Sequence, residues 1–340
     1  MTTIKEVAAQ AKVSTATVSR VLGSPNLVQA KTRNRVLDAV RELGYEPNFP
    51  ARSLRTQSTA KIIVTVPDIS NPFFASVMRG VEEAAQTGGY SVLLGDTRGE
   101  YVREEQYASM LLRKEADGLI FFGHRLPDCL RPLLDRTGTA APIVNGCEYT
   151  SELGVPSVHI DNVRAAYEAV ALLHSMGHRR IALLAGPRSP ITRDRMEGAM
   201  SFAKDFGFAS QMLVQRGDYT VESGARDAAT LLNSLSPPTA FFCFSDELAM
   251  GALWSVREQG LRCPEDISVV GFDDIRYARF LQPALTTIRQ PMARLGQTTV
   301  ELLLDILLDR AGPVASRIVE HDLIVRASTG PAPPQRQDKR

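Results

Sequence analysis

The sequence contains few of the residues that build disulfide frameworks, metal sites or catalytic centres. Its four cysteines are widely scattered and form no CxxC pair, and its five histidines show no metal-ligand spacing. Neither a nucleophile elbow nor a phosphate-binding glycine loop occurs. We therefore predict no metal, no cofactor and no catalytic residue, and we do not expect an enzyme.

Long apolar runs are also missing. No stretch approaches the length that spans a bilayer, and residues 1–6 lack the apolar core of a signal peptide. The 44% apolar and 23% charged residues are ordinary for a globular protein, and 340 residues suffice for two or three domains. We expect a cytoplasmic protein with no membrane partner.

Charge is unevenly distributed along the chain, although the net charge is only +1. Residues 1–60 hold nine Lys and Arg against four Asp and Glu, a difference of +5. The remaining residues hold 30 against 34, a difference of −4. A basic head on an acidic body is typical of a protein that binds a polyanion such as DNA, although a merely solvated basic surface has the same composition.

Residues 1–46 are predicted to form three short helices. Thr3 and Glu6 have the spacing of a capping box, which starts the first helix. Ser14 is placed to cap a second helix after a tight turn, and a third helix runs from about 30 to 43. This is the plan of a helix-turn-helix domain, whose second helix presents its first residues to the DNA major groove. A small helical cap on a larger protein would show the same spacing.

The second helix carries side chains suited to that groove. Thr15, Ala16 and Thr17 are small enough to let the helix sit deep, and threonine can meet base edges. The guanidinium of Arg20 can form a two-pronged hydrogen bond with guanine. These residues are the predicted base contacts of the head.

Residues 47–60 are predicted to be a connector between the head and the body. Leu54 lies between Arg52 and Arg55 in a segment too short to form a stable helix by itself. An apolar side chain flanked by cations suits a wedge that enters the minor groove and unstacks a base step. The alternative is a disordered linker with one incidental leucine.

The body, residues 61–330, alternates continuous apolar strands with amphipathic helices. A strand at 61–66 and a helix at about 73–87 open one series, and a second series restarts at 180–185. This pattern predicts parallel sheets covered by helices on both faces, hence two doubly wound α/β lobes. The expected divisions are lobe 1 at about 61–161 and 291–320, lobe 2 at about 162–290 and 321–330, and a disordered tail at 331–340 without a tetramerising helix.

Polar and aromatic residues follow several of these strands, where doubly wound folds bind ligands. Phe73 and Phe74 could sandwich a ring, Arg193 and Arg195 could clamp hydroxyl or carbonyl oxygens, and Asp273 could accept from vicinal hydroxyls. Tyr219 and Ser245 also stand at strand ends. Each position has a structural alternative: Phe73 and Phe74 as lobe core, Asp246 as a helix cap, Asp274 as a turn residue. Their convergence at one end of both sheets favours a binding site.

Several runs at fixed spacing carry a family resemblance. They are Ile4…Glu6-Val7-Ala8, Val13-Ser14…Thr17-Val18-Ser19-Arg20-Val21, Lys31-Thr32-Arg33, Gly44-Tyr45…Pro47-Asn48 and Ala51-Arg52-Ser53-Leu54. Residues 4–56 thereby resemble the head and hinge of the lactose/galactose repressor family of bacterial transcription regulators. The resemblance implies that Thr15, Ala16 and Arg20 face the operator's major groove, and that the two Leu54 side chains of a dimer insert at its centre. The sequence departs from the family at Gln29, where a serine cap is usual, and at Pro50, where valine is common.

The candidate DNA contacts form one set. They are Thr3, Ser14, Thr15, Ala16, Thr17, Ser19, Arg20, Asn48, Ala51, Arg52 and Leu54.

The body resembles the periplasmic-sugar-binding-like core of the same family, so the likeness covers nearly all of residues 3–328. The runs 66–74, 123–127, 158–162 and 242–246 are most similar to its cytidine-responsive branch. The implied effector contacts are Phe73, Phe74, Cys147, Arg193, Arg195, Tyr219, Ser245, Asp273 and Gln290. Cys147 departs from the Asp or Asn common there, so a hydroxyl contact is lost or taken over by Glu148.

These features predict a homodimeric repressor that binds a palindromic operator in double-stranded DNA. A cytidine-like nucleoside in the cleft between the lobes would regulate it, and its targets would be genes of nucleoside or pentose uptake and catabolism. Ribose or a purine nucleoside is the alternative effector. A sugar-binding transport protein would share the body but would need a signal peptide and no basic head. An α/β enzyme acting on nucleosides would need a general base or a metal in the cleft.

Overall fold

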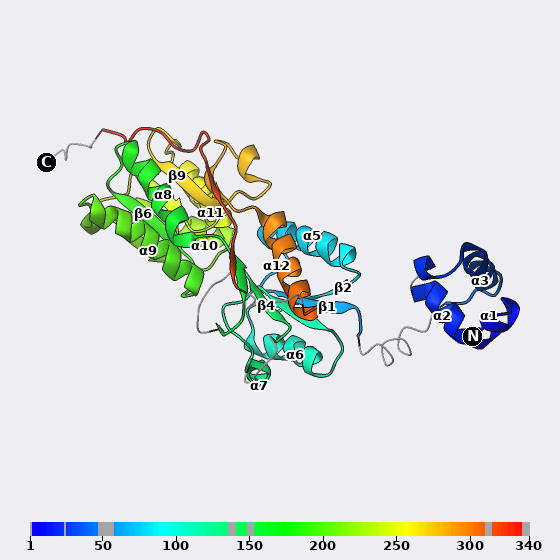
Figure 1. Ribbon diagram of the computed structural model, residues 1–340. Helices are drawn as coiled ribbons and strands as arrows, with labels where there is room; N and C mark the ends of the chain where they lie inside the picture. The colour runs from blue at the N-terminus through cyan, green and yellow to red at the C-terminus, as the bar shows by residue number, and fades with distance from the viewer. Residues whose placement is uncertain are drawn as a thin grey trace. The chain divides into compact units, whose positions relative to one another are not determined.

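The computed structural model describes residues 2–23, 25–46, 58–134, 141–147, 153–309 and 315–334. The chain divides into two compact units, residues 1–59 and 60–340. The first is all-helical, and the second contains two six-stranded sheets flanked by helices (Figure 1). The predicted fold class, a helix-turn-helix head with two doubly wound α/β lobes, is confirmed. Among the described residues no helix has both the length and the apolar character needed to cross a membrane.

The head consists of α1 (Ile4–Gln10), α2 (Thr15–Gly23), a 3-10 turn (Pro25–Leu27) and α3 (Ala30–Glu42). The predicted capping box is present: Thr3 Oγ1 accepts from Glu6 N, and the Glu6 carboxylate accepts from Thr3 N at 2.7 Å. Gln29 stands at the start of α3 without a side-chain cap. A small apolar core holds the three helices together; its buried members are Val7, Ala8, Ala11, Val18, Val21, Val36 and Ala39.

Lobe 1 is built on a sheet with strand order β11-β5-β4-β3-β1-β2, all pairs of which are parallel. Its strands are β1 (Lys61–Val66), β2 (Ser91–Asp96), β3 (Gly118–Phe121), β4 (Ile143–Gly146), β5 (Ser157–His159) and β11 (Arg317–Ile318). Its helices are α5 (Pro72–Thr87), α6 (Tyr101–Leu112), α7 (Arg131–Leu134), preceded by a 3-10 turn at Asp128–Leu130, and α12 (Met292–Leu307).

Lobe 2 repeats the plan with the order β12-β10-β9-β8-β6-β7, in which only β12 is antiparallel. Its strands are β6 (Ile181–Ala185), β7 (Leu213–Arg216), β8 (Ala240–Cys243), β9 (Ser268–Asp273), β10 (Thr286–Arg289) and β12 (Asp322–Ile324). Its helices are α8 (Asn162–Ser175), α9 (Pro190–Asp205), α10 (Val221–Leu232) and α11 (Asp246–Glu258), with 3-10 turns at Ala209–Gln211 and Ala278–Phe280.

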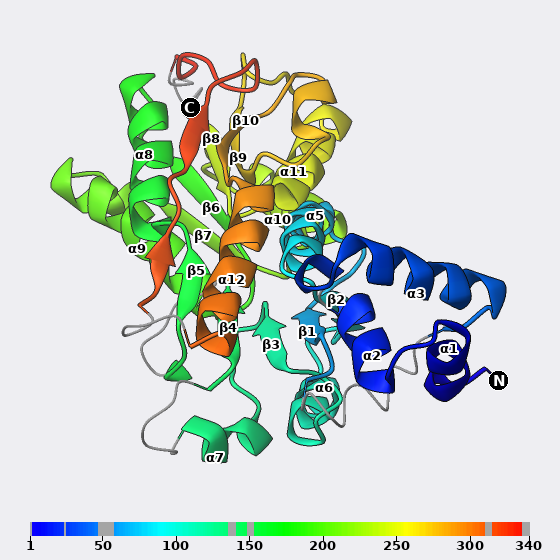
Figure 2. The same cartoon turned by 45° about the vertical axis from the view of Figure 1, so that its right-hand side comes forward.

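The chain passes between the lobes after β5, after β10, and between β11 and β12. Helix α12 therefore returns to lobe 1, where it packs beside α5 (Figures 1 and 2). Glycines allow this close approach, because a Cβ at Gly80 would lie 1.9 Å from the Ala293 carbonyl oxygen. In each sheet the first strand in chain order, β1 or β6, lies between the next two strands, β2 and β3 or β7 and β8. The strand order therefore reverses at β1 and at β6. In doubly wound folds, ligands bind at such a reversal, at the carboxyl ends of the strands.

The predicted disordered tail is 331–340, but the structure describes its first residues, 331–334. Ala332 N donates to the Met176 carbonyl oxygen at 2.8 Å. That carbonyl belongs to the residue that ends α8, where backbone oxygens lack partners within the helix. Ala332 therefore lies against lobe 2, whereas 335–340 fall outside the described residues.

Candidate DNA-binding and effector sites

The first turn of α2 presents the head's predicted DNA contacts. Ser14 Oγ accepts from Thr17 N at 3.2 Å, so Ser14 caps the helix as its spacing predicted. Thr15, Ala16 and Arg20 are exposed, whereas Val18 on the opposite face is fully buried. The helix thus buries one face in the head core and presents small side chains and one guanidinium outward.

The remaining candidates of the DNA set differ in exposure. Thr3 and Ser14 are exposed, and the hydroxyl of Thr3 is engaged in the capping box. Thr17 and Ser19 are half-buried. Asn48, Ala51, Arg52 and Leu54 lie outside the described residues, as do Pro50 and Glu148.

Arg195 is the most completely engaged of the predicted effector residues. It projects from α9 and is only 4% exposed. Its Nε donates to Asn162 Oδ1 at 2.9 Å, and another guanidinium nitrogen donates to the Phe244 carbonyl oxygen. Its Cζ lies over the Phe272 ring, 3.5 Å from the ring centroid. These contacts hold a buried cation in one orientation at the carboxyl ends of β8 and β9.

Asp273 and Gln290 form a hydrogen-bonded pair at the same edge. Gln290 Nε2 donates to Asp273 Oδ1 at 2.7 Å, and both residues are buried. Burial raises the pKa of Asp273 to about 6, against the opposing effect of the Arg195 guanidinium and the Gln290 hydrogen bond. A buried carboxylate beside a fixed cation can accept hydrogen bonds from ligand hydroxyls and offer the cation to ligand acceptors.

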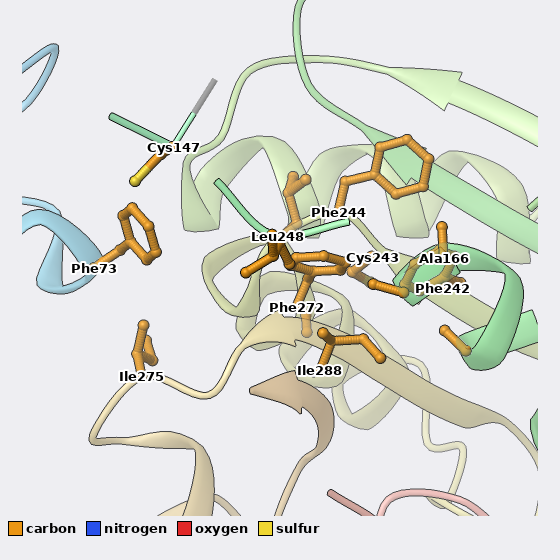
Figure 3. Close-up of a cluster of buried hydrophobic side chains, with 14 of the residues drawn as sticks. Phe73, Cys147, Ala166, Phe242, Cys243, Phe244, Leu248, Phe272, Ile275 and Ile288 are labelled. Carbon is orange, nitrogen blue, oxygen red and sulfur yellow. The ribbon is translucent and has the colours of Figure 1, made fainter. Parts of the chain in front are cut away.

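The two predicted aromatic residues do not form parallel walls. The Phe73 and Phe74 rings meet edge to face, with centroids 5.1 Å apart and planes at 81°. Phe73 is 6% exposed and lies between Cys147 and Ile275, a residue of lobe 2 (Figure 3). In this arrangement of the lobes Phe73 is therefore a core residue, and it does not stack with Phe74 on the two faces of a ligand ring. Cys147 itself is buried and adopts a left-handed backbone conformation with φ +67°, a conformation more usual for Asn or Asp.

Tyr219 and Ser245 have specific partners. Tyr219 Oη is hydrogen-bonded to Thr192 Oγ1 at 2.8 Å, and its ring packs on Gly186, where a Cβ would come within 2.3 Å. Ser245 Oγ accepts from Leu248 N, so Ser245 caps α11. Both positions border the carboxyl edge of the lobe 2 sheet.

One effector candidate and two structural alternatives are placed differently from expectation. Arg193 is exposed and pairs with Asp194 at 3.1 Å, so the structure does not bring it to Arg195. Asp246 is not the cap of α11, because its buried carboxylate accepts from Thr287 Oγ1 and Ile275 N. Asp274 is more than a turn residue, since it forms ion pairs with Arg289 and Arg326, each at 2.7 Å.

The sequence reasoning missed three residues that complete this region. Asn162 orients Arg195, and Asn71 donates from its Nδ2 to Glu247 Oε2 at 2.9 Å across the lobes. Asn71 had a detectable signal, because an asparagine before a proline at a helix start predicts a cap. Nothing in the spacing pointed to Asn162 or Glu247.

Two family profiles match the chain. One is described as "Bacterial regulatory proteins, lacI family" and matches residues 3–48. The other is described as "Periplasmic binding protein-like domain" and matches residues 151–329. The two matches fall on the head and on the body respectively.

Individual relatives extend over nearly the whole chain. The HTH-type transcriptional repressor CytR of Escherichia coli (strain K12) is 40% identical over 333 residues, 97% of each protein. The HTH-type transcriptional repressor PurR of Proteus mirabilis (strain HI4320) is 37% identical over 339 residues, 98% of each. Among solved structures, the lac repressor dimer bound to operator and the anti-inducer ONPF is similar with a TM-score of 0.84 and 30% identity. That likeness covers 97% of this chain and 99% of the other.

Proposed function

The chain belongs to the LacI family of bacterial regulatory proteins, which are DNA-binding transcription regulators and not enzymes. On this basis we propose that it represses genes of nucleoside or pentose uptake and catabolism. It does so in the cytoplasm as a homodimer on a palindromic operator. A cytidine-like nucleoside bound at the carboxyl edges of the two lobes controls the repression. The observation that carries the effector proposal is the buried set of Arg195, Asp273 and Gln290 at that edge.

The head, residues 1–46, supplies the DNA contacts. Arg20 and the small residues of the first turn of α2 face the bases, while head cations other than Arg41, which pairs with Asp38, contact phosphates. Residues 47–60 connect the head to the body and bring Leu54 to the operator centre, as the family resemblance implies. The body, 61–330, holds the effector and the dimer contacts.

The effector class follows from the chemistry at the lobe edges. A sugar offers neighbouring hydroxyls to Asp273, and Arg195 and Gln290 offer donors to sugar or base oxygens. Phe74 is half-buried next to Phe73 and provides an apolar edge for a base. The similarity of the body to the cytidine-responsive branch of the family supports a nucleoside, so a purine nucleoside is the second candidate and ribose the third.

Exposed aromatic side chains on lobe 2 support a homodimer. Trp254 on α11 is 57% exposed and Phe280, in the 3-10 turn after β9, is 72% exposed. Such side chains contribute to an interaction site where they belong to a contiguous apolar patch. A second copy is the proposed partner, because the similar lac repressor is described as a dimer bound to operator.

Effector and operator are linked through the arrangement of the lobes. A ligand that prefers one arrangement shifts the population toward it, and this changes the separation of the two connectors in the dimer. The coupling is reciprocal, so operator binding changes effector affinity by the same factor.

The DNA-binding half of the proposal predicts a steep salt dependence and a large effect of Arg20→Ala. Operator duplexes are selected with the full-length protein from a random library, and affinity is measured by fluorescence anisotropy between 50 and 200 mM salt (roughly the physiological range). The logarithm of affinity should fall by about 0.9 per phosphate contact for each tenfold rise in salt. Arg20→Ala should weaken binding by about 1–3 kcal/mol and relax the base preference at one position of each half-site.

Arg41→Ala is the matched control, because Arg41 is an exposed head arginine that already pairs with Asp38. It should bind nearly as the wild type does. A flat salt dependence, or equal losses in both variants, would argue against a base-reading role of α2.

A further inference from the structure

One hydrogen bond joins the lobes beside the proposed effector residues. Asn71 caps α5 in lobe 1, where its Oδ1 accepts from Phe73 N at 2.8 Å. The cap fixes the side-chain amide, so its Nδ2 points away from α5. That nitrogen donates to Oε2 of Glu247, in the first turn of α11 in lobe 2, at 2.9 Å.

Carboxylates from both lobes surround Glu247. Asp68 follows β1 in lobe 1 and is held in place by hydrogen bonds from the amide and hydroxyl of Ser70. Glu222, in the first turn of α10, and Asp273, at the end of β9, act on Glu247 from lobe 2. On its own helix Glu247 follows the buried Asp246.

We propose that Glu247 is a positioning residue for effector binding: its hydrogen bond with Asn71 latches the lobes together, and the surrounding carboxylates make this latch tighter in acid. Asn71 stands two residues before Phe73, and Glu247 two residues after Ser245. The latch therefore acts on effector residues of both lobes through short backbone segments. The latch between the lobes does not depend on the proposed function; only the effect of the latch on effector binding rests on it.

The direction of the pH effect follows from the environment of Glu247. Burial, then repulsion by Asp68, Asp273 and Glu222, raises the pKa of this carboxyl from 4.5 to about 7. When the lobes separate, the side chain returns to water and its pKa falls toward the ordinary value. The latched arrangement thus binds the proton more tightly. It is favoured as pH falls below about 7 and is opposed by charge repulsion as pH rises through 7.

The first test needs no effector. Thermal unfolding of the full-length protein is followed from about pH 5.5 to 8.5, a window chosen around the ordinary and raised values, for the wild type and Glu247→Gln. Glutamine keeps the shape and still accepts from Asn71, but carries no charge. At the alkaline end Glu247→Gln should unfold about 2–4 °C above the wild type, and the difference should vanish at the acidic end.

Two further variants separate the latch from a general effect of substitution. Glu258→Gln changes a carboxylate at the far end of α11 and should follow the wild type at every pH. Asn71→Ser keeps a capping oxygen for α5 but removes the amide nitrogen that donates to Glu247, so it should lower the unfolding temperature most in acid, where the latch is strongest. Curves for Glu247→Gln that parallel the wild type throughout would overturn the latch.

The second test connects the latch to the effector, with cytidine as the probe. Because proposed contacts lie on both lobes, the ratio of cytidine affinities, wild type over Glu247→Gln, should be about tenfold higher at pH 6 than at pH 8, the equivalent of one pKa unit. Titration of Asp273, whose pKa is about 6, acts on both proteins alike and cancels in this ratio. Equal pH dependence in the two proteins would contradict the coupling of latch to effector. Absence of cytidine binding at any pH, with the unfolding result intact, would instead reject cytidine as the effector.

Discussion

Replacing Arg195 by alanine is expected to abolish the effector response while operator binding persists. The change removes a buried cation together with its hydrogen bonds to Asn162 and Phe244 and its contact with the Phe272 ring. It also leaves Asp273 buried without its neighbouring positive charge. Since a hydrogen bond to a charged group contributes roughly 1.5–3 kcal/mol, effector affinity should fall by about 10- to 150-fold for each such bond to the effector that is lost. Calorimetry with cytidine and anisotropy on operator DNA measure the two properties separately.

Arg193→Ala is the natural control for this experiment. Arg193 stands on the same helix but is exposed and pairs only with its neighbour Asp194, so its loss should leave the effector response nearly unchanged. Arg195→Lys should fail like Arg195→Ala, because an ammonium group cannot reproduce the planar fork. A normal response in Arg195→Ala would remove this residue from the effector site.

Replacing Leu54 by alanine is expected to abolish operator binding while effector binding stays intact. Leu54 lies outside the described residues, so this expectation comes from the family resemblance and from the physics of a wedge in the minor groove. A buried leucine contributes about 1.5–3 kcal/mol relative to an exposed one. Two copies in a dimer should therefore account for roughly 100-fold or more in operator affinity. Anisotropy on the selected operator provides the measurement.

Leu27→Ala supplies the comparison for the wedge. Leu27 is also in the N-terminal unit and is 77% exposed, in the 3-10 turn between α2 and α3. Its truncation removes the same apolar volume without touching the connector, so operator affinity should change little. Unchanged affinity in Leu54→Ala would show that the connector leucine does not enter the duplex.

Local patterns predicted much of this fold because they act within one or two turns of chain. The Thr3–Glu6 capping box, the Ser14 cap and the alternation of apolar strands with helices all depend on near neighbours. The same reasoning placed Arg193 and Arg195 together after a strand. The structure instead starts α9 at Pro190, capped by Ser189, and this phase turns Arg195 inward and Arg193 outward. Residues two positions apart on a helix point to different faces, so only one of these two arginines could face the core.

Other features depended on contacts that sequence spacing does not reveal. Asn162 meets Arg195 because α8 and α9 pack together, and Asn71 meets Glu247 only through the arrangement of two separate lobes. Ser245 and Asp246 are adjacent, and either could cap α11 by its spacing. Ser245 is the cap because the Asp246 carboxylate accepts a hydrogen bond from Thr287 on β10 instead. Such pairings are fixed by the packing of the whole body, to which each local segment contributes little.

The coupling of effector and operator is tested most directly by measuring both affinities on one molecule. Operator affinity of the full-length protein is determined by anisotropy on the selected duplex, with and without saturating cytidine, adenosine or ribose. We predict that one of these compounds changes operator affinity by about 5–150-fold, and that operator DNA changes the affinity for that compound by the same factor. Operator affinity that stays the same with all three compounds would contradict the account.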